Sequence, residues 1–468
     1  MFGDRAAYYV AIFGLIGTGT LVAATRKEPL RFVFLALIAA LPIAATLVPP
    51  GRLGLTVFNV VMLFLTIVLV GRRLTSSAAN RQPLFPTRSL MIAWTLCIPC
   101  VVLSQFPGAS LVVFVLMFGT YAFFLFCLAE LRRDRGFERL VILLSGVAIV
   151  MAVGVLIDTV FRVNLSLRGS NFNQLTLLDA GVEIYRAGGF FQDPQRCGAF
   201  FAVLTTFLLV LVLRGRFKSA RVSAIVWLAI AAGLAALLMT ISRSAILSCL
   251  LVSTLALFAF NAWSWPLKAA VGVTVGIAGT LVAQTPLESW LGVLPDTLQA
   301  RMRELPEAFN GRVMVWFDTW DMFAKQPVTG IGLGSFRSYL IQTRPGVFDY
   351  YGIGGVTGVD YIPDQPESGY FKILYEGGLV GSAAGLLLVG DALRRALGGA
   401  VSASADARTE CIAALAGLLT FGATFVTVFT ISDPRLSALL AFLLAVIWKR
   451  SLDRATDRTE PPVNRRRA

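Results

Sequence analysis

Three arginines in this sequence lie in separate polar stretches between long apolar runs, each beside or near Gly or Ser: Arg186, Arg243 and Arg312. A guanidinium group donates two parallel hydrogen bonds to a phosphate, which lysine cannot do. A carboxylate, Glu367, stands directly before a later apolar run. Partial burial would raise its pKa toward neutrality, where it could accept a hydroxyl proton. These residue types indicate a phosphate or pyrophosphate site beside a general base.

Each residue also has a simpler interpretation. An arginine at the edge of a membrane span can extend its guanidinium group to lipid phosphates, and Arg243 lies in a very short turn between two apolar runs. Glu367, with Ser368, can cap the N-terminus of the helix that follows. Three arginines on one face favour an anion site more than one alone, and the capping role of Glu367 stays open at this point.

A glycine-rich run precedes Glu367 in the chain. Gly330, Gly332 and Gly334 form a GxGxG pattern, but no βαβ unit surrounds it, so we expect a tight turn or close packing and not a nucleotide site. Trp316 and Trp320 have helical spacing, which predicts a helix with one apolar face upstream of that run.

Composition places these residues in a membrane protein. The 468 residues are 56% hydrophobic and only 15% charged, with a mean hydropathy of +0.74, whereas soluble domains are about 25% charged. The net charge of +14 is spread over short linkers between apolar runs, which disfavours nucleic-acid binding. The sequence contains no histidine, which excludes Ser–His and Cys–His nucleophiles and His-ligated metal sites. The six cysteines lie in or beside apolar runs and are expected to be buried thiols.

The apolar runs predict an all-α, polytopic membrane protein with about thirteen transmembrane helices. The expected spans are 6–24, 32–48, 53–70, 89–103, 110–131, 140–160, 197–213, 223–240, 245–260, 269–282, 368–389, 409–430 and 436–448. They group into N-terminal helices (1–160), central helices (161–283), a long polar segment (284–366), C-terminal helices (367–448) and a tail (449–468).

Positive charge assigns the sides of the membrane. The linkers 72–88, 132–139, 214–221 and 394–408 and the tail are all basic, and alternation of the spans puts them on the cytoplasmic side. The N-terminus and the polar segment 284–366 are then external. All four charged candidates fall on that same external face. We see neither an inverted repeat nor charges in mid-span, which are the features expected of a transporter.

Taken together, several motifs resemble the O-antigen ligase and polymerase superfamily. They are the GR-xxx-W, P-xx-GIGLGSF and S-x-Y-…-E-x-G-xx-G patterns at 311–316, 327–336 and 368–381, with RAGGFFQDPQ and ISRSA upstream. The resemblance implies a GT-C-like bacterial inner-membrane glycosyltransferase with a large periplasmic loop and no cofactor or metal. Its substrates would be lipid-linked oligosaccharides on undecaprenyl pyrophosphate.

The resemblance also assigns roles and alternatives. Glu367 would be the general base of an inverting transfer, and the three arginines would bind pyrophosphate, with Arg243 also stabilising the leaving group. Asp193 and Tyr370 are further candidates for substrate binding. The Glu367–Ser368 pair stands where ligases carry His-Asn, and Gln195 replaces an Asn, which favours a repeat-unit polymerase. The alternatives are a ligase acting on lipid or protein and a flippase of lipid-linked sugars. A polymerase implies a chain-length regulator and a repeat-unit flippase as partners.

Overall fold

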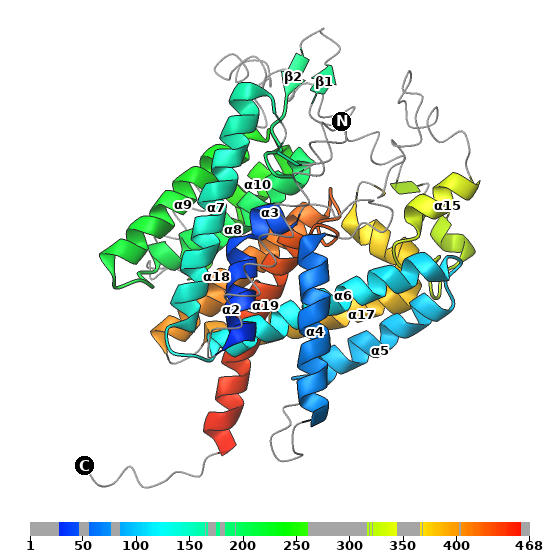
Figure 1. Ribbon diagram of the computed structural model, residues 1–468, viewed down its shortest axis with the longest axis horizontal. Helices are drawn as coiled ribbons and strands as arrows, with labels where there is room; N and C mark the ends of the chain where they lie inside the picture. Colours follow the sequence, from blue (N-terminus) through cyan, green and yellow to red (C-terminus); the bar gives the residue numbers. More distant parts are fainter. Residues whose placement is uncertain are drawn as a thin grey trace.

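The computed structural model describes residues 28–45, 56–75, 85–163, 165–166, 175–177, 183–191, 193–260, 316–317, 319–320, 322–343, 366, 368–401 and 404–459. Within these ranges the protein is a helical bundle with one small hairpin (Figure 1). The N-terminal helices are α2 (Pro29–Ala39), α3 (Leu41–Ala44), α4 (Val57–Thr75), α5 (Arg88–Val102), α6 (Pro107–Leu131) and α7 (Gly136–Phe161). They are followed by α8 (Pro194–Leu213), α9 (Ala220–Met239), α10 (Arg243–Phe260), α15 (Phe336–Thr343), α17 (Gly369–Ala400), α18 (Ala405–Phe425) and α19 (Pro434–Thr459).

The helices begin where the sequence supplies a starting signal. Proline opens α2, α6 and α8, where its missing N–H has no intrahelical partner to lose. Asp193 caps α8 and Ser404 caps α18 through side-chain oxygens. Helix α8 is apolar on all sides and almost wholly buried, so it lies at the centre, packed against α9, α10 and α18.

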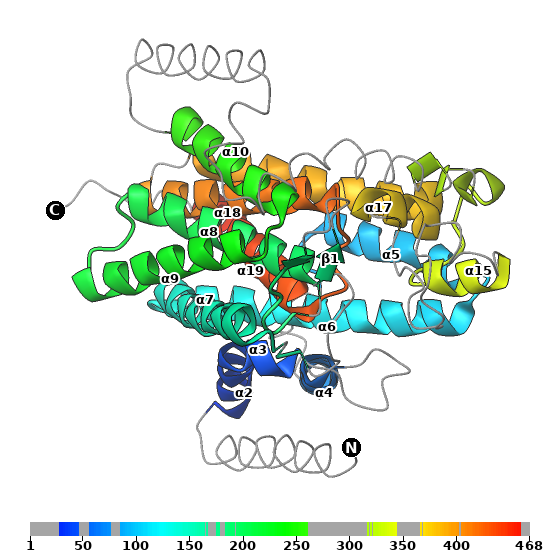
Figure 2. The same cartoon turned by 90° about the horizontal axis from the view of Figure 1, so that it is seen from above.

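Two groups of helices surround this centre. In Figures 1 and 2, α7, α8, α9 and α18 lie together, while α5, α6 and α17 extend side by side toward α15. Helices α2 and α4 pack on the face formed by α6 and α7 (Figure 2). The carboxylate of Asp391 on α17 accepts hydrogen bonds from Ser89 and Arg395 and so fixes α17 against α5.

Among the described residues, five helices are long and apolar enough to cross a membrane: α6, α7, α8, α9 and α17. They coincide with five of the expected spans. The expected span 32–48 is not one helix, because it breaks at Ala40 into α2 and the short α3. Spans 6–24 and 269–282 lie outside the described residues, as does most of 284–366, so the total of about thirteen stays a prediction.

The all-α prediction holds for the bundle but not for the connection before α8. There, β1 (Leu175–Leu177) pairs antiparallel with β2 (Glu183–Tyr185). The polar segment after α7 carries no helical apolar period, so a short hairpin is compatible with its sequence.

The expectation that no buried charge lies in mid-span was wrong. Lys372 and Glu376 are both buried in the first part of α17, and Asp158 is fully buried in α7. Each is paired or hydrogen-bonded, as buried charges must be. The average hydropathy of these spans is high enough to conceal single charges within them.

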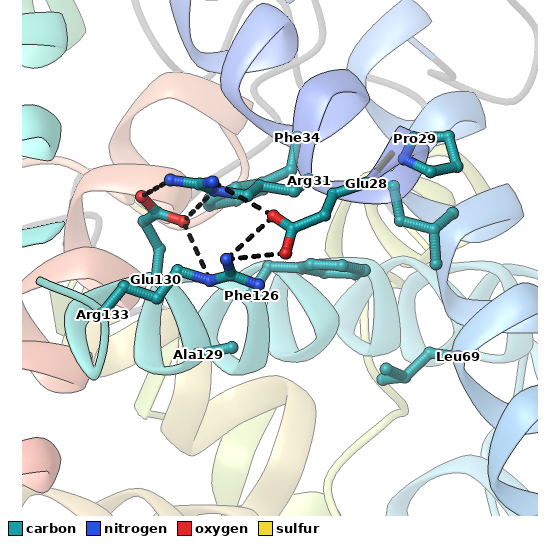
Figure 3. Close-up of a pocket in the computed structure, with 10 residues that line it drawn as sticks. Glu28, Pro29, Arg31, Phe34, Leu69, Phe126, Ala129, Glu130 and Arg133 are labelled. Atoms are coloured by element: carbon teal, nitrogen blue, oxygen red, sulfur yellow. Dashed lines mark hydrogen bonds and ion pairs between the residues drawn. The ribbon is translucent and has the colours of Figure 1, made fainter. Parts of the chain in front are cut away.

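Ion pairs gather at one end of the bundle, formed by residues 28–31, 130–139, 214–221, 391–410 and 448, which we call the basic end. Buried Glu130 accepts hydrogen bonds from Arg31 at 2.8 and 3.0 Å and is also paired with Arg139. Figure 3 shows Arg31 and Arg133 bridging the carboxylates of Glu130 and Glu28 beside a pocket of about 340 Å³. These contacts fasten α2 to the turn between α6 and α7.

The same end joins the other basic linkers. Arg216 donates to Glu410 at 2.7 and 2.9 Å and lies over the ring of Phe137, and Arg395 lies over Trp448. These basic linkers, which the alternation of the expected spans assigned to one side of the membrane, therefore meet at one end of the bundle. That arrangement is the one expected if all of them face the cytoplasm.

Candidate functional site

The opposite end of the bundle carries the sequence-predicted residues that the structure describes. Arg186 follows β2 in a stretch without regular secondary structure, and its side chain is 6% exposed. Its Nε donates to the carbonyl of Thr240 at 3.3 Å. This bond joins the stretch that follows β2 to the turn between α9 and α10, so two of the predicted arginine-bearing segments lie together.

The stretch that carries Arg186 is held by α7. Asp158 Oδ2 accepts hydrogen bonds from the backbone N–H groups of Gly188 and Gly189 at 2.8 and 2.7 Å, and Oδ1 accepts from the Tyr185 hydroxyl. Burial, together with this bond, raises the pKa of Tyr185, so the hydroxyl stays protonated and continues to donate.

Glycine permits the close approach of this stretch to α7. Gly189 has a φ of +58°, and a Cβ there would lie 2.9 Å from the backbone nitrogen of Val155. From the side of α7, a Cβ on Gly154 would likewise lie 2.4 Å from the ring of Phe190. Real Cβ atoms do not approach so closely, so the two surfaces fit only because both positions lack a side chain.

Arg243 is the first residue of α10, directly after a strained turn. Ile241 has a φ of +50°, which is unfavourable for a β-branched residue and is sustained by the packing around it. Helix α8 provides that packing through Gly198, where a Cβ would lie 2.6 Å from that of Ser242. Arg243 is partly exposed at this end.

Asp193 has a structural role that is visible in its contacts. Its Oδ1 accepts from the N–H of Gln195 at 2.8 Å and caps α8, and its other oxygen lies 3.9 Å from Arg196. The predicted role of Asp193 in substrate binding stays a prediction.

The glycine-rich run packs against a break in α17. Gly378 has non-helical backbone angles, so the backbone groups on either side of it lack their usual partners within the helix. The glycine-rich run and the residues just before it supply these partners: Ile331 N–H donates to Tyr375 O, and Leu379 N–H donates to Pro327 O. Gly332, with a φ of +113°, lies so close to Ser104 that no side chain fits. The predicted close packing is thereby confirmed for 330–336.

Glu376 completes this junction. Its carboxylate accepts from the N–H groups of Gly334 and Phe336 at 2.9 and 3.0 Å, at the start of α15. Lys372, one turn earlier, lies 3.8 Å from Glu376 and 4.7 Å from the ring centre of Phe429. In Figure 1, α15 accordingly lies beside the first part of α17.

Tyr370 is fixed to α18 at the same end. Its hydroxyl donates to the carbonyl of Gly422 at 2.9 Å, and its ring contacts Phe425 edge-on. Upstream, helical residues 316–317 and 319–320 bring Trp316 onto the ring of Phe371 at 5.4 Å. The helical spacing of Trp316 and Trp320 is consistent with these assignments.

Two predicted residues, Arg312 and Glu367, lie outside the described residues. Pro366 and Ser368, which flank Glu367, are both buried at the start of α17. Three charged residues of this end were given no role from the sequence: Asp158, Lys372 and Glu376. The signal that could have identified them is a charged residue inside an apolar run, which is rare without a function or a partner.

The described candidates therefore gather at one end of the bundle. We call it the site end: residues 158, 185–191, 193, 240–243, 327–336, 368–376 and 422–435. Arg186, Arg243, Lys372 and Arg435 lie at this end, and a guanidinium group suits the binding of an anionic group.

Comparison with known proteins extends this description. No curated protein matches the sequence. Residues 228–386, from within α9 to within α17, match the family model Wzy_C, O-antigen ligase, which confirms the similarity to the O-antigen ligase and polymerase superfamily over that part of the chain.

Proposed function

We propose that this protein polymerises oligosaccharide repeat units carried on undecaprenyl pyrophosphate, at the periplasmic face of the inner membrane. The family match supports a membrane enzyme of the O-antigen ligase and polymerase type. The donor is a growing glycan on its lipid pyrophosphate, and the acceptor is a sugar hydroxyl on a new lipid-linked repeat unit.

The chemistry assigned to the site is an inverting displacement. Glu367 accepts the proton of the acceptor hydroxyl, whose oxygen attacks the anomeric carbon as the bond to pyrophosphate breaks. Arg186, Arg243 and Arg312 bind the pyrophosphate and stabilise its charge as it leaves. The general base and the cations then act on opposite sides of the reacting carbon.

The observation that best supports the proposal is the hydrogen bond from Arg186 to Thr240. It joins two segments that are far apart in sequence, and Thr240 lies three residues before Arg243. Arg186 is buried, and so is Ser368, the residue after Glu367. An isolated arginine that extends toward lipid would need neither a buried position nor a strained turn beside it.

A ligase is the second candidate, because the matching family model is described as O-antigen ligase. The two activities differ in the acceptor. Purified protein in lipid, supplied only with lipid-linked repeat units, forms longer lipid-linked glycans if it is a polymerase. If product appears only when a different lipid or protein acceptor is added, the ligase assignment is correct.

The assay also tests the general base. Glu367→Gln retains the size and can still accept a hydrogen bond from a helix N-terminus, but it cannot accept a proton. We expect a loss of about 10²–10⁴-fold in rate, with donor binding intact. Glu138→Gln, at the basic end, is the matched control. Near wild-type turnover of Glu367→Gln would remove the carboxylate from the mechanism.

A further inference from the structure

The stretch that carries Arg186 is held from two sides by buried charges of opposite sign. This RAGGFF segment, residues 186–191, has no regular secondary structure, so its backbone groups need partners from elsewhere. On one side lies Asp158 of α7, and on the other lies Arg435 in the first turn of α19. Neither residue belongs to the motifs that predicted the site.

Asp158 satisfies the N–H groups of the segment. Its Oδ2 accepts from Gly188 and Gly189, and its Oδ1 fixes Tyr185, the residue before Arg186. Asp158 is fully buried. Hydrogen bonds to a charged acceptor are stronger than neutral ones, so this carboxylate determines where the backbone of the segment runs.

Arg435 satisfies the carbonyl side. Its Nη2 donates to Phe190 O and to Pro42 O, both at 2.9 Å. Its Nη1 donates to Asp433 Oδ2 at 3.3 Å. The guanidinium carbon lies 4.5 Å from the ring centre of Phe191, over its face. The side chain is 3% exposed, so Arg435 binds the segment to α3 and α19 inside the bundle.

Three further backbone groups of the segment also have partners. Gly189 O accepts from Leu165 N–H at 3.0 Å, and Gly188 O accepts from Phe191 N–H at 2.9 Å. With both ends fixed, the direction of Arg186 toward Thr240 is determined. Buried ions contribute little net stability compared with apolar residues of the same size, so precise placement of the segment is the benefit they supply here.

We propose that Asp158 and Arg435 are positioning residues, which hold the RAGGFF segment so that Arg186 presents its guanidinium group to the lipid-linked pyrophosphate. This inference rests on the proposed function of Arg186. Neither residue transfers a proton, because Asp158 is engaged by three donors and Arg435 by three acceptors.

Two variants of Asp158 test the inference. Asp158→Leu removes the acceptors at similar volume, and we expect about tenfold or greater loss of donor affinity, about 1.4 kcal/mol per tenfold. Asp158→Asn should remain within about threefold of wild type, because its carbonyl oxygen can still accept from both glycines while its amide donates to Tyr185. An equal loss of donor affinity in both variants would overturn the proposal, because Asn retains the acceptor for the glycine N–H groups.

Hydrogen exchange measures the positioning directly. In Asp158→Leu, peptides covering 186–191 should exchange about tenfold faster or more, while peptides at the basic end stay unchanged. If Asp158→Leu does not fold, Arg435→Lys provides the same test, because lysine cannot hold Phe190 O and Pro42 O in the planar geometry of a guanidinium group. Unchanged exchange at 186–191 in the folded variants would overturn the proposal.

A double-mutant cycle separates this inference from the proposed function. If Asp158 acts through Arg186, then Asp158→Leu should add no further loss of donor affinity to Arg186→Ala. Additive losses would overturn the positioning role. Unchanged affinity in Arg186→Ala alone would instead refute the anion site. Glu410→Gln, which removes a buried carboxylate at the basic end, is the control and should retain donor affinity.

Discussion

Replacing Gly198 by alanine should disturb the site end with one added methyl group. The new Cβ would lie 2.6 Å from Ser242 Cβ and 3.0 Å from Thr240 Oγ1. Carbon atoms in contact prefer about 3.5 Å, so the turn between α9 and α10 must move by about 0.9 Å (3.5 − 2.6). That turn supplies the carbonyl that binds Arg186 and leads directly into Arg243.

Gly198→Ala should lower activity more than it lowers stability. Overpacking costs about 1–3 kcal/mol, and the better helix propensity of alanine returns up to about 1 kcal/mol, so the net destabilisation is about 0–3 kcal/mol. A displacement of about 1 Å in a site can lower turnover by about 100-fold. We therefore expect Gly198→Ala to fold, with a Tm lowered by a few degrees, and to lose most of its polymerisation activity.

Two further variants make the test specific. Gly146→Ala, in α7, has nothing within 4 Å of the new Cβ and should leave activity unchanged while raising the Tm slightly. Ser242→Gly removes the Cβ that the methyl group added at position 198 would strike, and it should restore activity to Gly198→Ala. The reasoning is refuted if Gly198→Ala is fully active, or if Ser242→Gly fails to rescue an inactive protein.

Three other outcomes are expected. Arg243→Lys should be nearly as damaging as Arg243→Ala in a polymer-formation assay, because lysine keeps the charge but loses the two-pronged contact; full activity of the lysine variant would make Arg243 an interfacial residue only. Hydrogen bonds from Arg133, and then from Arg31, lower the pKa of Glu28, so its stabilising contribution is present above pH 4.5 and is lost as the pH falls below that value. The Tm difference between wild type and Glu28→Gln should therefore vanish in acid, and a constant difference would contradict this assignment. Gly332→Ala should release the glycine-rich run from α17, since its φ of +113° and its contact with Ser104 exclude a side chain; faster proteolysis within 327–343 would reveal the release, and unchanged proteolysis would argue against it.

The helices could be predicted because lipid and the protein interior both require apolar residues over a fixed length. The run from Pro194 to Leu213 and its cap, Asp193, illustrate how directly the sequence encodes a buried helix. Five spans and the similarity to the O-antigen ligase and polymerase superfamily followed from such patterns, and so did the close packing of the glycine-rich run.

The contacts between distant segments could not be predicted. Nothing local to Asp158 indicates that its partners are thirty residues downstream, and nothing local to Glu376 indicates that it accepts from Gly334 and Phe336. The break between α2 and α3 was missed because Pro42 lies in an apolar run whose average remains high. Pairing through tertiary structure determines these features, and one sequence does not record it.

The break in α17 also bears on how the chain is made. Leu379 and Val380 donate to carbonyls of Pro327 and Val328, while Tyr375 and Glu376 accept from Ile331 and Gly332. Within a bilayer, each of these four backbone groups would cost several kcal/mol if left without a partner. Because residues 327–332 are synthesised before α17, the partners of its break are available when that helix enters the membrane. In a circular permutation that placed α17 ahead of residue 327, the break would enter the membrane before its partners were made.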